Sequence, residues 1–159
     1  MPDCARRRLA VLLRSLCGAV CADDILPRWK RWLRNCNGAA LWAVSSTNRW
    51  VVEAGVAAFG IPREKVLAAA VRVADGLLTA ELIDVPTDDG KARALRRAGV
   101  SAPDVVFGNS LHDLAMLEMA RLAVPVNASD GLRRAAAERG WRLMQPAGAE
   151  GSEEIVGQD

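Results

Sequence analysis

The hydrophobic residues of this chain fall into two kinds of pattern that alternate along most of its length. Short uninterrupted apolar runs are typical of strands buried on both faces of a sheet. Segments with apolar residues three and four positions apart are typical of helices packed on such a sheet. The predicted strands are 40–44, 105–107 and 122–126, and the predicted helices after them are 50–59, 111–120 and 129–140. This order predicts an α/β domain with a parallel sheet.

Between the first two of these strands the pattern predicts a hairpin and another helix. Two runs rich in β-formers, 67–73 and 77–82, flank Asp75-Gly76, and Asp-Gly between such runs is a strong turn signal. The polar loop 87–91 then begins a helix that ends near Ala98.

The first 38 residues have a different character, and their spacing predicts helices. Over 5–20 the leucines and valines form one stripe, and a second amphipathic helix is predicted from Asp24, with tryptophans on its apolar side and basic residues opposite. A secretory signal is an alternative for the start, but Arg14 interrupts the apolar stretch. We therefore divide the chain into a helical segment 1–38, a core 39–144 and a disordered tail 145–159.

Composition narrows the function classes. The chain has 159 residues, 51% hydrophobic and 25% charged, which predicts one globular domain. A net charge of +2 gives no argument for a nucleic-acid or membrane-surface partner. The four cysteines lack the spacing of a zinc site, and no apolar run approaches the ~20 residues of a membrane span. The expected protein is cytoplasmic, with reduced cysteines.

Polar groups follow the predicted strands and loops at 45–48, 88–91, 109–113 and 127–130. The carboxyl ends of parallel strands share one edge, where ligands bind. Ser45 before a helix can bind a phosphate oxygen, and Lys91 can place an ammonium group against it. Oxygen ligands from Asn109 and Asp113 suit Mg²⁺. Taken singly, Ser45 is more often a helix cap, Lys91 a solvated lysine and Asp113 a first-turn acid. Their order along the chain and their common place at strand ends therefore carry the hypothesis.

Three segments together resemble a known family. They are Trp42-Ala43-Val44-Ser45-Ser46-Thr47-Asn48, Asp89-Gly90-Lys91-Ala92 and Phe107-Gly108-Asn109-Ser110-Leu111-His112-Asp113-Leu114-Ala115-Met116-Leu117. They resemble motifs two, three and four of the haloacid dehalogenase superfamily, in chain order, with the phosphoserine-phosphatase-like members as the nearest subgroup. The resemblance covers about 24–144, and the fourth motif is its most specific part.

This resemblance implies a Rossmann-like sheet and a Mg²⁺-dependent phosphomonoesterase site for a phosphorylated small molecule. Ser45 and Ser46 would bind the phosphoryl group, Lys91 would stabilise its charge, and Asn109 and Asp113 would help hold Mg²⁺. The family usually has Asp where Asn109 stands, so the metal should be held less tightly. No role is assigned to His112.

The first motif of the family is the larger departure. It is an apolar strand followed by Asp-x-Asp, whose first Asp attacks phosphorus, and this chain contains no Asp-x-Asp. Ala22-Asp23-Asp24 is the nearest candidate, with Ile25 at the position of the second acid. The favoured interpretation is that residues 1–38 match the end of the cap region and the last helices before motif two, with the motif-one strand upstream of Met1. The predicted nucleophile among these residues is therefore none.

That departure predicts a gap in the middle of the sheet. Without a central strand its neighbours would expose unpaired backbone edges, so either the N-terminal segment fills the gap or the chain needs a missing segment or an oligomeric partner. We expect the C-terminal part of a phosphomonoesterase, inactive alone. The alternative is a non-catalytic binding or regulatory module on a degenerate fold of this kind.

Overall fold

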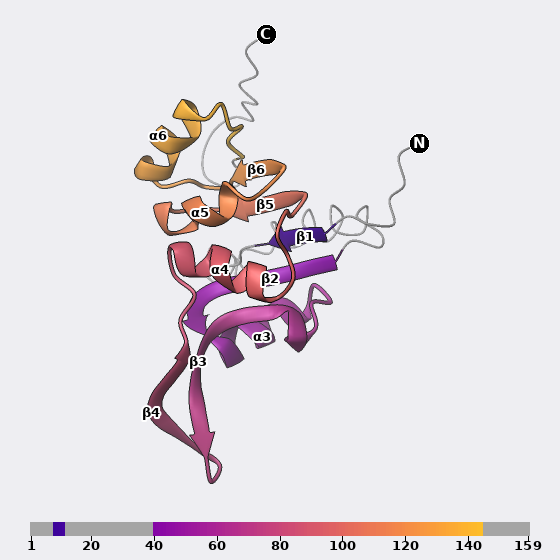
Figure 1. Ribbon diagram of the computed structural model, residues 1–159, viewed down its shortest axis with the longest axis vertical. Helices are drawn as coiled ribbons and strands as arrows, with labels where there is room; N and C mark the ends of the chain where they lie inside the picture. The colour runs from indigo at the N-terminus through magenta and orange to yellow at the C-terminus, as the bar shows by residue number, and fades with distance from the viewer. Residues whose placement is uncertain (1–7, 12–39, 145–159) are drawn as a thin grey trace.

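A six-stranded sheet with strand order β4-β3-β2-β1-β5-β6 forms the middle of the molecule (Figure 1). The computed structural model describes residues 8–11, by their backbone only, and 40–144. The strands are β1 (Arg8–Val11), β2 (Ala40–Asn48), β3 (Val66–Ala74), β4 (Leu77–Asp84), β5 (Val105–Gly108) and β6 (Leu122–Pro125). Neighbouring strands are parallel except for the antiparallel pair β3–β4. The predicted α/β fold with a parallel sheet is confirmed.

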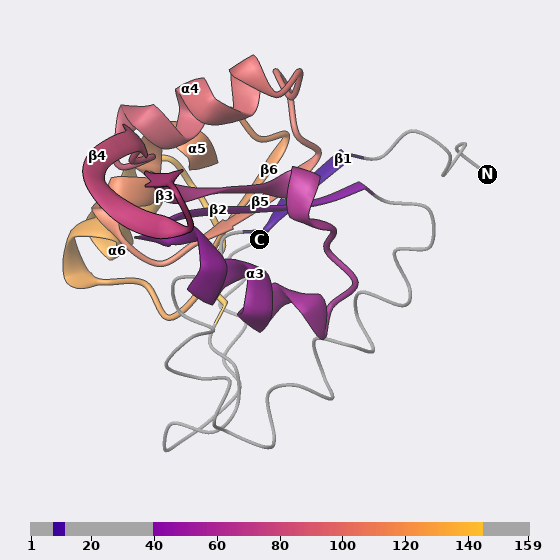
Figure 2. The same ribbon diagram turned by 90° about the horizontal axis from the view of Figure 1, so that it is seen from below.

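Helices cover both faces of this sheet. Helix α3 (Arg49–Ala57) lies on one face, and α4 (Asp89–Arg97) and α5 (Leu114–Leu117) lie on the other (Figure 2). Adjacent residues of β2 point to opposite faces, as the two-residue period of a strand requires. Ala43 packs in the core cluster of α3, and Val44 packs in the second cluster with residues of α4, α5 and α6 (Asp130–Glu138). The site therefore rests on two packed layers.

The structure corrects part of the helix predicted over 5–20, and the rest of that range lies outside the described residues. Residues 8–11 form β1, which pairs in parallel with β2 on one side and β5 on the other. The gap predicted in the middle of the sheet is therefore filled by this segment, the first of the two alternatives. Pairing satisfies the backbone edges of both neighbours, and that outweighs the weak helical preference of a short apolar run. The predicted helix from Asp24 and the tail 145–159 lie outside the described residues.

Other element boundaries differ in detail. Strand β2 continues through the segment predicted as a turn, with an irregular register between Ser45 and Asn48. Helix α3 begins where the Asn48 side chain accepts a hydrogen bond of 3.0 Å from the Trp50 backbone N–H. The helix predicted over 111–120 is a 3-10 turn (Leu111–Asp113) followed by the short α5. The last predicted strand, 141–144, is reduced to one bridge between Val126 and Met144.

The predicted hairpin is confirmed, and it projects away from the body of the molecule (Figure 1). Asp75 and Gly76 have φ angles of 51° and 77°, the left-handed values that a tight hairpin turn requires at both central positions. Leu77 at its tip is 72% exposed. Within the described ranges, no helix is long and apolar enough to cross a membrane.

Candidate phosphate-binding site

The candidate site residues leave the sheet at the same level. Val11 in β1 pairs with Ala43 of β2 and with Phe107 of β5. Ser45 and Asn109 each follow those partners by two positions, so both lie at the carboxyl edge of the sheet on either side of β1. The sequence prediction that these groups share one edge agrees with this register.

A buried ion pair joins two of the predicted residues. Lys91, in the first turn of α4, donates from Nζ to Asp113 Oδ1, and both side chains are 0% exposed. The pair connects α4 to the turn after β5. Its two residues are 22 positions apart in sequence. The ammonium group is thus fixed beside the carboxyl edge, where a phosphate oxygen can accept from one of its other N–H donors.

The Asp113 carboxylate is held from its other side by the loop that follows β5. Its Oδ2 accepts from the backbone N–H groups of Asn109, at 2.8 Å, and Ser110, at 3.1 Å. A Cβ at Gly108 would lie 2.7 Å from Asp113 Cβ, so only glycine permits this close approach. The Gly-Asn-Ser run predicted as part of the site therefore acts first as a cradle for Asp113.

The side-chain oxygen of Asn109 lies next to this cradle and can accept a hydrogen bond. Its backbone carbonyl accepts a hydrogen bond of 2.9 Å from the Ser129 N–H, which brings the loop after β6 to the site. Its side-chain Oδ1 is buried and has no hydrogen-bond partner among the described residues. A buried acceptor without a partner is unfavourable by about 1–3 kcal/mol, so this oxygen is suited to a ligand donor or a cation.

Ser45 is buried at the end of the regular part of β2, as predicted, and Ser46 is partly buried after it. The Ser45 hydroxyl accepts a hydrogen bond of 3.1 Å from the Thr47 backbone N–H. This bond shapes the strand-to-helix turn. The hydroxyl hydrogen remains a donor that a phosphate oxygen can accept.

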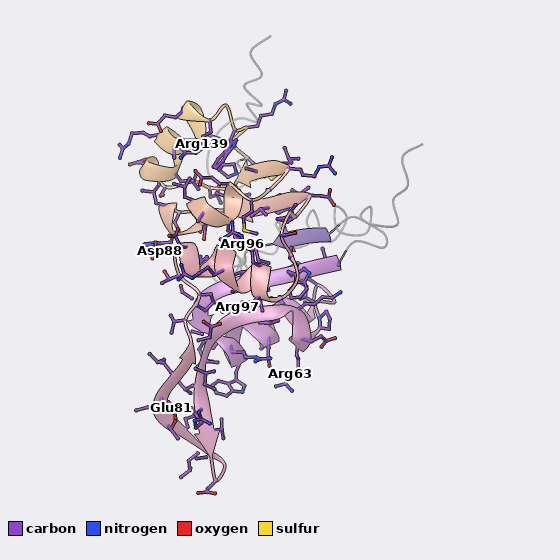
Figure 3. All side chains as sticks on the ribbon, viewed as in Figure 1. Arg63, Glu81, Asp88, Arg96, Arg97 and Arg139 are labelled. Atoms are coloured by element: carbon purple, nitrogen blue, oxygen red, sulfur yellow. The ribbon has the colours of Figure 1, made fainter. Side chains whose placement is uncertain are left out.

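Two further residues, Asp88 and His112, lie at the exposed rim, and the sequence prediction gave neither a role. His112 Nδ1 is 2.6 Å from Asp88 Oδ1, and Figure 3 places Asp88 at the outer end of α4. The His112 hydrogen bond, followed by one from Thr87, lowers the pKa of Asp88. Asp88 and His112 are 24 positions apart, so no local sequence pattern predicts their contact. The one available signal was the place of His112 directly before Asp113 in the fourth motif.

The described residues alone fall short of a Mg²⁺ site. Asn109 Oδ1 is an open but neutral ligand, and the charge of Asp113 is balanced by Lys91. No group of three or more acidic, histidine or cysteine side chains suited to a metal occurs in the described part of the chain. Protein Mg²⁺ sites use one or two carboxylates together with oxygens of a phosphate ligand. Mg²⁺ here would depend on oxygens that a phosphate ligand brings.

Comparison with known proteins assigns this architecture to a family. The parallel sheet, with a lysine and polar strand-end loops at its carboxyl edge, defines an α/β fold that binds its ligand at that edge. The family model for haloacid dehalogenase-like hydrolases matches residues 3–118, so the chain belongs to that family. No curated protein matches significantly.

Solved structures support the same fold. A protein of unknown function from Bordetella pertussis Tohama I superposes with a TM-score of 0.67 at 22% identity, over 82% of this chain and 62% of that one. A probable phosphoserine phosphatase from Vibrio cholerae gives 0.56 at 13% identity, over 84% and 60%. A phosphoserine phosphohydrolase-like protein from Francisella tularensis subsp. tularensis SCHU S4 gives 0.53 at 18%, over 83% and 64%. The chain thus spans a little under two thirds of these structures.

Proposed function

We propose that this chain is a phosphate-binding domain of the haloacid dehalogenase-like family that does not transfer a phosphoryl group to aspartate. Two observations support this proposal. They are the buried Lys91–Asp113 pair at the carboxyl edge and the sequence that follows the central strand β1. After Val11 of β1, the first acidic residue in the sequence is Asp23. In this proposal the site binds a phosphate group, and no aspartate directly follows β1 to attack it.

The ligand in this proposal is a phosphorylated small molecule or inorganic phosphate. Lys91 supplies the positive charge, the Ser45 hydroxyl and the Ser46 region supply donors at the start of α3, and Asp113 holds Lys91 in place. Asn109 Oδ1 and Asp113 would hold Mg²⁺ only together with the oxygens of the phosphate, and the ion would neutralise the charge of the phosphate. The domain then serves as a binding or regulatory module.

Calorimetric titration of the full chain tests this binding function. Inorganic phosphate should bind weakly, Mg²⁺ alone should give no heat, and Mg²⁺ should tighten the phosphate isotherm. Lys91→Gln should abolish phosphate binding, whereas Arg96→Gln, which removes an exposed charge from the same helix, should leave it unchanged. An isotherm that Lys91→Gln does not alter contradicts the proposal.

Hydrolysis of p-nitrophenyl phosphate tests the missing chemistry. No turnover above the buffer blank is expected from the purified chain. Turnover that disappears in Lys91→Gln would overturn the non-catalytic assignment. If Asp23→Asn also removed it, the nucleophile would be the Asp23-Asp24 alternative.

A second candidate is the C-terminal part of a longer Mg²⁺-dependent phosphomonoesterase. Its specific support is a length comparison, since the chain spans 62% of the Bordetella pertussis structure and 60% of the Vibrio cholerae structure. It requires a nucleophile from outside this sequence. Genomic DNA that encodes an apolar strand with Asp-x-Asp in frame before Met1 would favour it, and a closed upstream frame would remove it.

A further inference from the structure

The Asp88–His112 pair at the rim orients the imidazole ring. The carboxylate of Asp88 accepts through Oδ1 from His112, at 2.6 Å, and through Oδ2 from the Thr87 hydroxyl, at 3.0 Å. A carboxylate has no proton to donate and can only accept in these two bonds. Nδ1 of His112 is therefore the donor in its bond to Asp88.

An imidazole with its proton on Nδ1 has a lone pair on Nε2. The side chain of His112 is 54% exposed, so a small molecule can reach the ring. A carboxylate that holds the opposite ring nitrogen orients the imidazole and stabilises the positive charge that develops when Nε2 forms a bond. This arrangement suits a nucleophile.

The pair stands beside the phosphate-binding groups. Asp88 is the residue before α4 and lies three positions from Lys91, and His112 directly precedes Asp113. The same two segments are therefore joined twice, once by the buried Lys91–Asp113 pair and once by the exposed pair.

The backbone of Asp88 adds an independent observation. Its φ of 48° and ψ of −127° are rarely adopted by a residue with a side chain. Such conformations are unfavourable by about 1–3 kcal/mol and gather at functional sites. The fold holds the Asp88 carboxylate in this position against that local strain.

Resting on the proposed phosphate-binding function, we propose that His112 accepts a phosphoryl group from a small acyl phosphate. The donor binds with its phosphate toward Lys91, and His112 Nε2 attacks phosphorus. The N–P bond forms as the P–O bond to the acyl group breaks, and the carboxylate leaves with the electron pair. The proton on Nδ1 stays between His112 and Asp88, whose negative charge balances the phosphorylated ring.

Acetyl phosphate is the probe, and the single histidine of the chain makes the assay specific. Intact-mass measurement of the full chain should show one added phosphoryl group, stable in base and lost in acid, as a phosphorylated imidazole behaves. His112→Gln should not gain it. Asp88→Asn should slow the gain by roughly tenfold or more, since a positioned acid–base partner contributes on that scale or above. Asp89→Asn, one position along and also exposed, should react like the unmodified chain.

Three results would overturn the inference. The first is that the chain gains no phosphoryl group. The second is that the added group is labile in base or is also gained by His112→Gln. The third is that the chain unfolded in urea is phosphorylated at the same rate as the folded chain. Phosphate titration of His112→Gln separates this failure from failure of the proposed function. If that variant binds phosphate and the unmodified chain is not phosphorylated, the binding function stands and His112 is no acceptor.

Discussion

Two ion pairs of the same chemistry lie in opposite settings. Lys91 and Asp113 are completely buried between α4 and the turn after β5. Arg72 and Glu81 face each other across the projecting hairpin, with exposed fractions of 59% and 56% and two hydrogen bonds of 2.6 and 2.8 Å. The exposed pair has the more favourable geometry, because two guanidinium nitrogens of Arg72 bond the two carboxylate oxygens of Glu81.

The difference separates stability from function. An exposed pair loses little hydration and gains little, because water and salt screen it. A buried pair must recover a desolvation penalty of several kcal/mol per ion, and apolar residues of similar size are often as stable. The buried pair is therefore poor evidence for a stabilising role, and its place at the carboxyl edge favours a role in binding.

The largest effect is expected when the buried pair is broken on one side. Lys91→Met leaves the Asp113 charge buried without its partner, so the free energy of unfolding should fall by about 3–5 kcal/mol. Urea unfolding followed by circular dichroism measures it. Lys91→Met combined with Asp113→Asn removes both charges and should recover most of the stability but no phosphate binding. Recovery of binding in this double variant would contradict the functional role of the pair.

An intermediate effect is expected from crowding the cradle without touching either charge. Gly108→Ala forces a methyl group against Asp113 Cβ and the Leu117 side chain, and overpacking of this kind costs about 1–3 kcal/mol. Gly55→Ala in α3 is the matched control, because a Cβ there meets nothing within 4 Å. It should stabilise by about 0.5–1 kcal/mol. Equal effects in urea unfolding would show that Gly108 does not position Asp113.

The smallest effect is expected from the exposed pair. The Arg72 hydrogen bond lowers the pKa of Glu81, so its contribution is present above the ordinary glutamate value of about 4.3 and is lost as the pH falls through the lower folded-state pKa. Arg72→Gln should shift the urea midpoint slightly at pH 7, and the shift should be smaller in about 1 M NaCl, where the Debye length falls to ~3 Å. If Arg72→Gln shifted the urea midpoint as much as Lys91→Met does, the exposed and buried pairs would not differ in their effect on stability.

The sequence predicted the layout of the site better than its contacts. Strand-end position predicts Ser45 and Asn109 at one edge, because parallel strands share that edge, and the register of β1 with β2 and β5 agrees with this. The pairing of Lys91 with Asp113, and of Asp88 with His112, depends on how α4 packs beside the turn after β5. Those contacts join residues more than twenty positions apart, and no periodicity in the sequence encodes them.

The N-terminal error has a different cause. The leucines after Arg8 satisfy the spacing of a helix, and a short apolar run is equally compatible with a buried strand. The choice is made by the open edges of β2 and β5, which exist only once the rest of the sheet is assembled. The Asp-Gly hairpin was predicted correctly because its turn geometry is set locally, by two adjacent residues.

The position of β1 also has a consequence for the order of folding. Ala10 pairs with Trp42 on one side and with Val106 on the other, so the centre of the sheet joins the start of the sequence to its last third. Closing such long loops is entropically costly and makes folding slow. On a ribosome, β1 would wait without its second neighbour until β5 had emerged, while the local β3–β4 hairpin could already form.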